Sequence, residues 1–215
     1  MTAVKLRDAV VLLGGFPALA GADLSIDRGE IVLVRGANGA GKSTLLHLCA
    51  GLLPLASGQG EVLGCDLGTD RAAVRRRVGL MGHDTALYGE LSAAENLRFW
   101  ARASRVGDAD VAGALARLGL SERLRDVPTA RLSAGQRRRV ALAAMVVRRP
   151  ELWLLDEPHA GLDTTGRELV DDIVTAAAAA GAAVVLATHE TSRAGGLAIR
   201  AVVMAGGTLA GETAA

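Results

Sequence analysis

The chain has 215 residues, the size of one substantial domain, and a chain of this length can bury a core without disulfides or a structural metal. Its formal net charge of +1 gives no electrostatic reason to expect nucleic acid as the main partner. Two Phe, two Trp and one Tyr are too few for the stacking platforms of proteins that bind single-stranded nucleic acid. Composition and charge therefore argue against a nucleic-acid-binding protein.

The two cysteines, Cys49 and Cys65, occur without a C-x-x-C pair or a histidine cluster. This usage is typical of a protein in a reducing cytoplasm rather than one held together by disulfides or zinc. The charged residues Lys5, Arg7 and Asp8 interrupt the start of the chain, so we expect no secretory signal peptide.

The first half of the chain changes from a strand pattern to a helix pattern. Residues 4–35 alternate short apolar stretches with turns, one of them at Gly14-Gly15, and are expected to form β-strands. Glycine punctuation over 57–66 predicts a further hairpin-like region. Helical spacing of apolar residues then runs from Ala93 to about Val127.

The second half alternates predicted helices and strands. A helix is expected from about Ala134 to Arg149, ended by Pro150. The elements expected after it are a buried parallel strand over 152–155, a helix over 165–180, a strand over 182–188 and a terminal hairpin over 202–209. A mostly helical block therefore interrupts an α/β core.

The longest apolar tract, residues 173–187, is not expected to cross a membrane. It is rich in Ala, is broken by Gly181 and is shorter than a membrane span requires. We expect it to form the end of a helix, a turn at Gly181 and a strand.

A glycine loop between a predicted strand and a predicted helix carries the strongest functional signal. The loop matches G-x-x-x-x-G-K-[ST] in full and follows the apolar run Ile31–Val34. Its residues are Gly36, Ala37, Asn38, Gly39, Ala40, Gly41, Lys42, Ser43 and Thr44. In such a loop, N–H groups converge on phosphates, Lys42 reaches the β- and γ-phosphates, and the Ser43 hydroxyl holds Mg²⁺. The alternative is a glycine-rich turn that happens to carry Lys-Ser. Such a turn would not explain the strand before the loop and the helix after it, so we expect a nucleoside triphosphate site.

Two adjacent carboxylates, Asp156 and Glu157, follow the predicted strand 152–155. In a parallel sheet, this end of a strand borders the crevice where ligands bind. Asp156 is placed to hold Mg²⁺ together with Ser43, and Glu157 is placed to polarise the water that attacks the γ-phosphate. The alternative is an acidic turn at a strand end, and the complete glycine loop makes that alternative the weaker one.

A serine at the start of the predicted helix 134–149 has two interpretations. Ser133 is well placed as an N-cap, which suffices as a structural explanation. Gly135 and the N–H groups of this helix start would also form a second anion site. A second copy of the chain could present that site to the γ-phosphate bound by the first.

Five motifs follow one another in an order typical of one family. They are the glycine loop, Leu132-Ser133-Ala134-Gly135-Gln136, Asp156-Glu157-Pro158, Gly161-Leu162-Asp163 and Thr188-His189. The set resembles the nucleotide-binding subunit of an ATP-binding cassette (ABC) transporter over essentially the whole chain. The resemblance implies an α/β fold, a P-loop NTPase (RecA-like) core with an antiparallel β subdomain. It also implies one domain over residues 1–215, with a helical subdomain inserted at about 85–150.

The same resemblance implies partners and further site residues. It implies a head-to-tail dimer, expected to pair two copies of the chain, in which two ATP molecules are sandwiched between subunits. The segment opposite the glycine loop would be Ser133, Ala134, Gly135 and Gln136. His189 would contact the γ-phosphate and Glu157, and Asp163 would communicate across the interface. Membrane subunits would bind this ATPase at the cytoplasmic face of the cell membrane.

The chain departs from the family pattern at three places. Ala134 stands where most members have Gly, a modest change at a helix start. Leu13 aligns with the usual adenine-stacking aromatic, and nearby Phe16 is either its replacement or a core residue. His83 falls where a glutamine usually touches Mg²⁺ or the attacking water, so it is either a catalytic residue or a loop histidine without that role.

A second resemblance concerns the transported cargo. Gly82-His83, the segment 90–99 and the Leu-Ser-Ala-Gly-Gln motif resemble the ATP-binding subunit of the heme exporter used in cytochrome c maturation. Asp84 and Tyr88 do not follow that pattern. The alternatives are the same ATPase serving a lipid, drug or peptide exporter, and a soluble ABC ATPase without a transport role.

Overall fold

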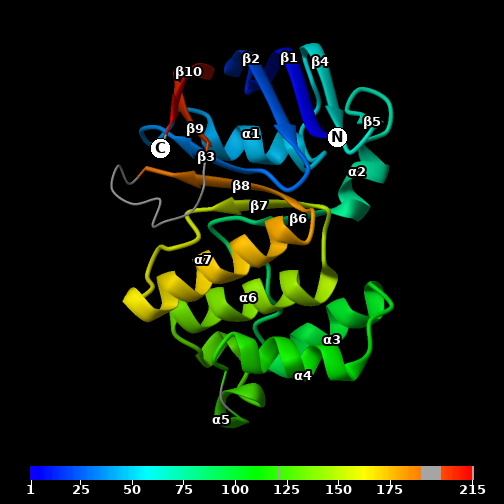
Figure 1. Cartoon of the computed structure of the whole chain (residues 1–215), viewed down its shortest axis with the longest axis vertical. Helices are drawn as coiled ribbons and strands as arrows, with labels where there is room; N and C mark the ends of the chain where they lie inside the picture. The colour runs from blue at the N-terminus through cyan, green and yellow to red at the C-terminus, as the bar shows by residue number, and fades with distance from the viewer. Residues whose placement is uncertain (121, 190–199, 215) are drawn as a thin grey trace. The chain divides into compact units, whose positions relative to one another are not determined.

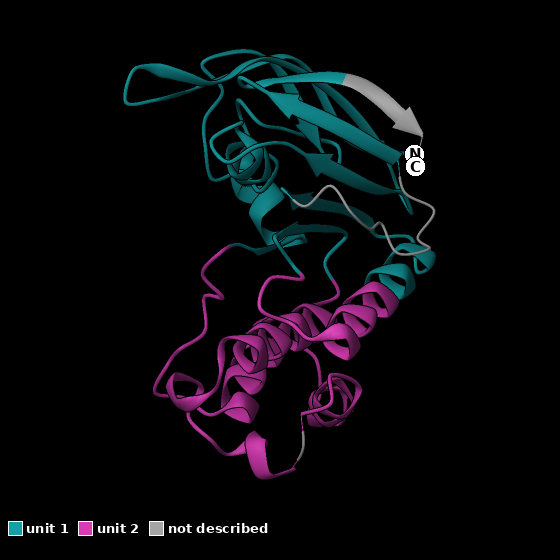
Figure 2. Ribbon diagram, turned by 90° about the vertical axis from the view of Figure 1, so that its left-hand side faces the viewer, with its two compact units in different colours: residues 1–82, 150–158, 174–215 teal, residues 83–149, 159–173 magenta. Residues whose placement is uncertain are grey.

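The computed structural model of the chain describes residues 1–120, 122–189 and 200–214. Its residues fall into two units, which are coloured separately in Figure 2. The first unit comprises residues 1–82, 150–158 and 174–215, and the second comprises residues 83–149 and 159–173.

The N-terminal strands of the first unit form an antiparallel sheet in the order β2-β1-β4-β5. Its strands are β1 (Thr2–Leu13), β2 (Phe16–Asp27), β4 (Ser57–Val62) and β5 (Cys65–Asp66). Buried and exposed residues alternate over 22–27 of β2, because successive side chains of a strand point to opposite faces. The alternation in β1 is interrupted where its register with β2 shifts. The strands expected over 4–35 and the hairpin expected near 57–66 are confirmed.

A six-stranded sheet follows the order β10-β9-β3-β8-β7-β6. Its strands are β3 (Ile31–Arg35), β6 (Val78–Met81), β7 (Leu152–Asp156), β8 (Ala183–Thr188), β9 (Arg200–Ala205) and β10 (Thr208–Ala214). All pairs are parallel except the β9–β10 hairpin at one edge. Every residue of β7 is buried, which confirms the predicted buried parallel strand.

Helix α1 (Lys42–Cys49) packs between the two sheets, in contact with β1 and β2 on one side and β7 and β8 on the other (Figure 1). Its Leu45, Leu46 and Leu48 are essentially inaccessible to solvent, and they join one core with residues of both sheets. This packing fixes the beginning of α1 against the ends of β3 and β7.

The second unit consists of helices. They are α3 (Ala93–Ala103), α4 (Asp108–Arg117), α5 (Glu122–Arg125), the 3₁₀ turn Thr129–Arg131, α6 (Ala134–Arg148) and residues 164–173 of α7 (Thr164–Ala179). Helices α3, α4 and α6 pack against one another (Figure 1). Both α3 and α6 begin with a capping box, Ser92 with Glu95 and Ser133 with Gln136. The expected mixture of an α/β part, an antiparallel sheet and a helical part is confirmed.

The apolar tract 173–187 folds as the sequence predicts. Helix α7 ends at Ala179, Gly181 adopts a positive φ of 92°, and β8 begins at Ala183. Across the described residues, the helices are all too short or too polar to span a bilayer.

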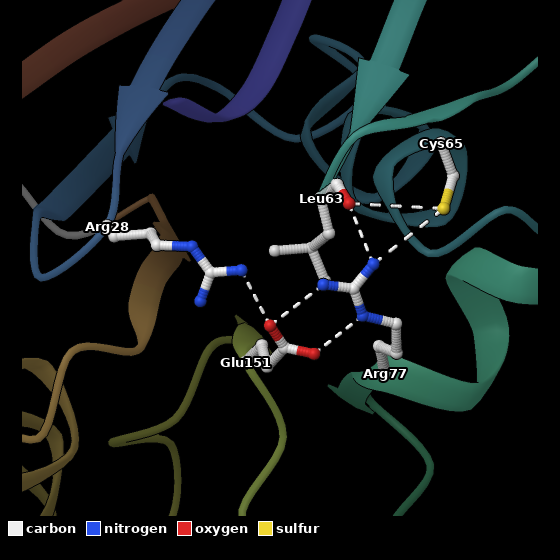
Figure 3. Close-up of polar contacts among 5 residues, drawn as sticks. All are labelled: Arg28, Leu63, Cys65, Arg77 and Glu151. Carbon is white, nitrogen blue, oxygen red and sulfur yellow. Dashed lines mark hydrogen bonds and ion pairs between the residues drawn. The ribbon is translucent and has the colours of Figure 1, made fainter. Parts of the chain in front are cut away.

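A charged cluster joins four segments of the first unit at the start of β7 (Figure 3). Glu151 accepts hydrogen bonds from Arg77 Nε at 2.6 Å and Nη2 at 2.9 Å, and from Arg28 Nη2 at 2.6 Å. Arg77, the last residue of α2 (Arg71–Arg77), also donates to the Leu63 carbonyl at 2.7 Å. These contacts hold the pKa of Glu151 near 2, chiefly through the hydrogen bonds from Arg77.

Candidate active site

The glycine loop connects the end of β3 to the beginning of α1, and two of its glycines are required by close backbone contacts. Gly41 precedes the helix with φ at 107°, and a Cβ there would lie 2.7 Å from the Ala18 carbonyl oxygen. A Cβ on Gly36 would clash with the Met204 carbonyl oxygen. The loop therefore takes its shape from backbone packing that no larger residue permits.

Backbone donors and a buried cation meet where α1 begins. The Leu45 N–H donates to the Gly41 carbonyl, so the N–H groups of Lys42, Ser43 and Thr44 precede the first bond that the helix makes internally. Lys42 is 7% exposed, and its Nζ donates to the carbonyls of Gly36 at 2.8 Å and Ala37 at 3.0 Å. Free N–H groups, a helix dipole and a held ammonium together form a cradle for phosphate.

The structure brings Ser43 and Asp156 together although 113 residues separate them. Ser43 Oγ donates to Asp156 Oδ2 at 2.6 Å, and Asp156, the last residue of β7, is buried. Within the described residues, no three His, Cys, Asp or Glu side chains form a group that could hold a metal ion. A hydroxyl and one carboxylate fit Mg²⁺, which takes few protein oxygens and fills its other positions with phosphate oxygens and water.

Glu157 lies one residue further on and is held at both its backbone and its side chain. Its φ of 48° is in the left-handed region, and its N–H donates to the Ala187 carbonyl at 2.9 Å. Oε1 accepts from the His189 N–H at 2.9 Å and lies 2.7 Å from His189 Nδ1, while Oε2 accepts from Thr188 Oγ1 at 3.0 Å.

These contacts keep Glu157 ionised. Partial burial raises its pKa, but hydrogen bonds from His189 and Thr188 outweigh the burial, and the net effect lowers the pKa below its ordinary value. An ionised carboxylate at a strand end can accept a proton from a water molecule.

The segment that begins with Ser133 belongs to the second unit and forms a capped helix start. Ser133 Oγ accepts from the Gln136 N–H at 3.2 Å, and Gln136 Oε1 accepts from the Ser133 N–H at 2.9 Å. The predicted N-cap is therefore confirmed. Gly135 lies against the loop at Gly161, where a Cβ on Gly135 would be 3.0 Å from the Gly161 carbonyl oxygen.

The remaining predicted residues have different surroundings. Asp163 Oδ1 accepts from the Gly166 N–H at 2.8 Å at the start of α7. His83 is exposed and is the first residue of the second unit. Phe16 is 79% exposed at the β1–β2 turn, so its interpretation as a core residue is wrong. Phe16 begins β2 and pairs with Leu13 at the end of the β1–β2 hairpin, where Leu12 and Leu13 are exposed as well, so this end of the hairpin lies beyond the core.

Thr188 contacts the candidate catalytic carboxylate, and sequence reasoning gave it no role. The signal that could have found it is its place at the end of an apolar strand, directly before His189. Register explains the contact, because Asp156 pairs with Ala187 and the next residues of both strands therefore meet.

A strand, a glycine loop and a helix around a buried lysine, beside an acidic strand end, define a P-loop nucleotide-binding protein. The chain belongs to the ABC transporter family, whose model matches residues 19–160. It is an ATP-binding subunit of this family and an ATPase.

Relatives of known name align with most of the chain. The cytochrome c biogenesis ATP-binding export protein CcmA of Paramagnetospirillum magneticum is 43% identical, over 85% of this chain and 86% of the relative. The protein of the same name from Mesorhizobium japonicum is 40% identical, over 82% of this chain and 86% of the relative.

Solved structures have the same fold. An ATP-binding subunit of an ABC transporter superposes with a TM-score of 0.90 at 27% identity, covering 99% of this chain and 90% of that one. A dimeric ATP-binding cassette in a post-hydrolysis state, bound to ADP and phosphate, superposes with a TM-score of 0.88 at 25% identity, covering 98% of both chains.

Proposed function

We propose that this ATPase powers the export of heme across the cytoplasmic membrane for cytochrome c biogenesis. The observation that carries the proposal is the similarity to cytochrome c biogenesis export proteins, at about 40% identity over most of both chains. Gly82-His83 and the segment 90–99, which resemble heme-exporter subunits, support the same assignment.

In the proposed mechanism, the phosphates of ATP lie at the N-terminus of α1. Lys42 exchanges the loop carbonyls of Gly36 and Ala37 for β- and γ-phosphate oxygens. Ser43 and Asp156 would hold Mg²⁺, which would neutralise phosphate charge. Glu157 accepts a proton from the attacking water, and His189 holds Glu157 in place and contacts the γ-phosphate.

A second copy of the chain completes the proposed site. Its segment Ser133–Gln136 faces the γ-phosphate in a head-to-tail dimer, and Asp163 communicates across the interface. Dimeric structures of an ATP-binding cassette of this fold support this arrangement. We assign to His83 the contact with Mg²⁺ or the attacking water that a glutamine usually makes in this family. We also propose that residues 1–215 form one domain, into which the helical segment at about 85–150 is inserted.

The proposed location is the cytoplasmic face of the membrane, where the chain binds membrane subunits of the exporter. An aromatic cluster on the second unit, in which Tyr88 and Phe99 are exposed and Trp100 is half-buried, supports such a partner. The ring centroids of Tyr88 and Phe99 lie 5.0 Å apart and those of Phe99 and Trp100 5.3 Å apart, and Arg148 covers the Trp100 ring at 4.7 Å. Exposed aromatic residues beside arginine are typical of protein interfaces.

The test is a gentle detergent purification of tagged Glu157→Gln chain with Mg-ATP, followed by identification of the membrane proteins recovered. This variant is expected to retain ATP, to hydrolyse it at least about 100-fold more slowly, and to trap the dimer with cytochrome c maturation proteins. Lys42→Ala is the matched control and is expected to recover neither nucleotide nor trapped dimer.

Three other outcomes contradict different parts of the proposal. Recovery of unrelated permeases removes the heme assignment and leaves the ATPase mechanism standing. Absence of any membrane partner favours a soluble ABC ATPase. Hydrolysis by Glu157→Gln at the wild-type rate shows that the catalytic residue is misassigned.

A further inference from the structure

The two carboxylate oxygens of Glu157 are held by two adjacent residues of one segment. Oε1 faces the backbone N–H and the ring of His189, at 2.9 and 2.7 Å, whereas Oε2 accepts the hydroxyl hydrogen bond of Thr188 at 3.0 Å. The family motifs account for His189 but leave the hydroxyl of Thr188 without a function.

We propose that Thr188 is a positioning residue that sets the plane of the Glu157 carboxylate for its work on the attacking water. The proposal rests on the proposed role of Glu157 as the residue that accepts the proton of that water. In this proposal Thr188 acts through Glu157, whose Oε2 accepts its hydroxyl hydrogen bond.

A second anchor is needed because one anchored oxygen does not fix a carboxylate. The terminal torsion of a glutamate side chain is broad, so a carboxylate held at Oε1 alone turns about its last bond. Holding Oε2 as well fixes the plane and therefore the direction of the lone pairs. A proton acceptor works only within hydrogen-bond reach of its proton, and a small misplacement costs much of the rate.

The backbone brings Thr188 to this position. Asp156 pairs with Ala187 in parallel register, and the Glu157 N–H continues the ladder to the Ala187 carbonyl. Glu157 then leaves the strand in a left-handed conformation, with φ at 48°. Glu157 and Thr188 each directly follow a member of the Asp156–Ala187 pair. Their side chains therefore meet at the same edge of the sheet.

The test is steady-state ATPase kinetics of the full chain with Thr188→Val, which keeps the side-chain shape and removes the hydroxyl, and Thr188→Ser, which keeps the hydroxyl. Thr188→Val is expected to lower kcat about 10-fold or more and to change the KM for ATP less than about two-fold. Thr188→Ser is expected to restore kcat to within about three-fold of the wild type. A merely structural hydroxyl would not separate kcat from KM in this way.

Thr208→Val is the matched control, because Thr208 also donates its hydroxyl to a neighbour at a strand end, the Ala205 carbonyl at 2.9 Å, in the β9–β10 hairpin. It is expected to leave kcat and KM unchanged. In a Glu157→Gln background, Thr188→Val is expected to cause no further loss, because its effect passes through the carboxylate.

The outcomes separate this inference from the proposed function. If Glu157→Gln is inactive but Thr188→Val has the wild-type kcat, the positioning role is wrong and the catalytic assignment stands. A Thr188→Val loss that Thr188→Ser does not restore, or that is shared between kcat and KM, also overturns the positioning role. If Glu157→Gln is fully active, both assignments fall together.

Discussion

Single residues in the glycine loop are constrained by backbone geometry as well as by phosphate chemistry. Gly41 has both a positive φ and a carbonyl oxygen, that of Ala18, in the space a side chain would fill. Such a position penalises any substitution twice, through strain and through a clash. The loop is therefore sensitive to changes that add only one carbon.

Gly41→Ala is expected to lower the free energy of unfolding by about 2 kcal/mol, because alanine strains the left-handed backbone and meets the Ala18 carbonyl. It is also expected to weaken ATP binding at least about 10-fold, since the N–H groups of α1 shift. Chemical denaturation and nucleotide titration measure the two effects.

The matched control is Gly113→Ala in the interior of α4, where a Cβ meets no atom within 4 Å. This change is expected to raise the free energy of unfolding by about 0.5–1 kcal/mol, because alanine favours a helix, and to leave ATP binding unchanged. Equal effects of the two substitutions would contradict the special role of the Gly41 backbone.

At the scale of elements, two helices of the second unit begin in the same way, and only one of them carries a family motif. Ser92 caps α3 and Ser133 caps α6, each with a reciprocal partner three residues later. A comparison of variants at Ser92 and Ser133 can therefore distinguish the effect of losing a helix cap from the effect of losing a nucleotide contact. Loss of either cap costs about 1 kcal/mol.

Ser133→Ala and Ser92→Ala are accordingly expected to lower the free energy of unfolding by similar amounts, about 1 kcal/mol each. Only Ser133→Ala is expected to reduce ATPase activity further, by about 10-fold, because its hydroxyl would also face the γ-phosphate of the partner copy. Denaturation curves and ATPase rates on the same samples make the comparison. Equal activity in the two variants would leave Ser133 with its capping role alone.

The Glu151 cluster shows how elements far apart in sequence are joined. It links the β2–β3 turn, the end of α2, the β4–β5 turn and the start of β7 through Arg28, Arg77 and the Leu63 carbonyl (Figure 3). The pKa of Glu151 falls from its ordinary value of 4.5 to about 2. Because the folded pKa lies below the unfolded one, the stabilisation is complete above about pH 4.5 and is lost as the pH falls toward 2.

Glu151→Gln is expected to lower the free energy of unfolding at pH 7 by about 1–2 kcal/mol, an amount reduced by solvent screening because the glutamate side chain is 37% exposed. The difference from the wild type is expected to shrink between pH 4.5 and pH 2, as Glu151 becomes protonated in the wild type. Denaturation at a series of pH values measures it. A difference independent of pH would show that the charge of Glu151 does not contribute.

At the scale of the whole molecule, ATP is a stabiliser of the folded chain. A ligand that binds only the folded state adds RT ln(1 + [L]/Kd), about 2.7 kcal/mol at 100 times Kd. Mg-ATP is therefore expected to raise the Tm of the Glu157→Gln variant by several degrees and to leave that of Lys42→Ala nearly unchanged. A similar shift in the Lys42→Ala variant would mean that ATP binds elsewhere.

The sequence predicted those parts of the molecule that depend on local patterns. The loop with Lys42, the strand ending in Asp156 and the N-cap Ser133 were all visible in short stretches, because spacing and residue type define them. The exposed position of Phe16 was not visible, since an aromatic residue near a turn fits a core equally well.

Contacts between residues far apart in the sequence could not be predicted. The contacts of Glu151 with Arg28 and Arg77 join residues 123 and 74 positions apart, and isolated charged residues in a sequence usually predict only a solvated surface. Thr188 meets Glu157 only through the register of β7 and β8, which no single motif specifies.

The positions of the two tryptophans have a practical consequence. Trp153 is buried in β7, three residues before Asp156, with its indole N–H bonded to the Pro150 carbonyl at 3.1 Å. Trp100 lies in the second unit, between Phe99 and the guanidinium of Arg148. Each unit therefore carries one tryptophan in a distinct environment. Trp100→Phe would leave only the tryptophan emission of the first unit, and Trp153→Phe only that of the second. The protein can report on each of its halves during a nucleotide cycle without an added dye.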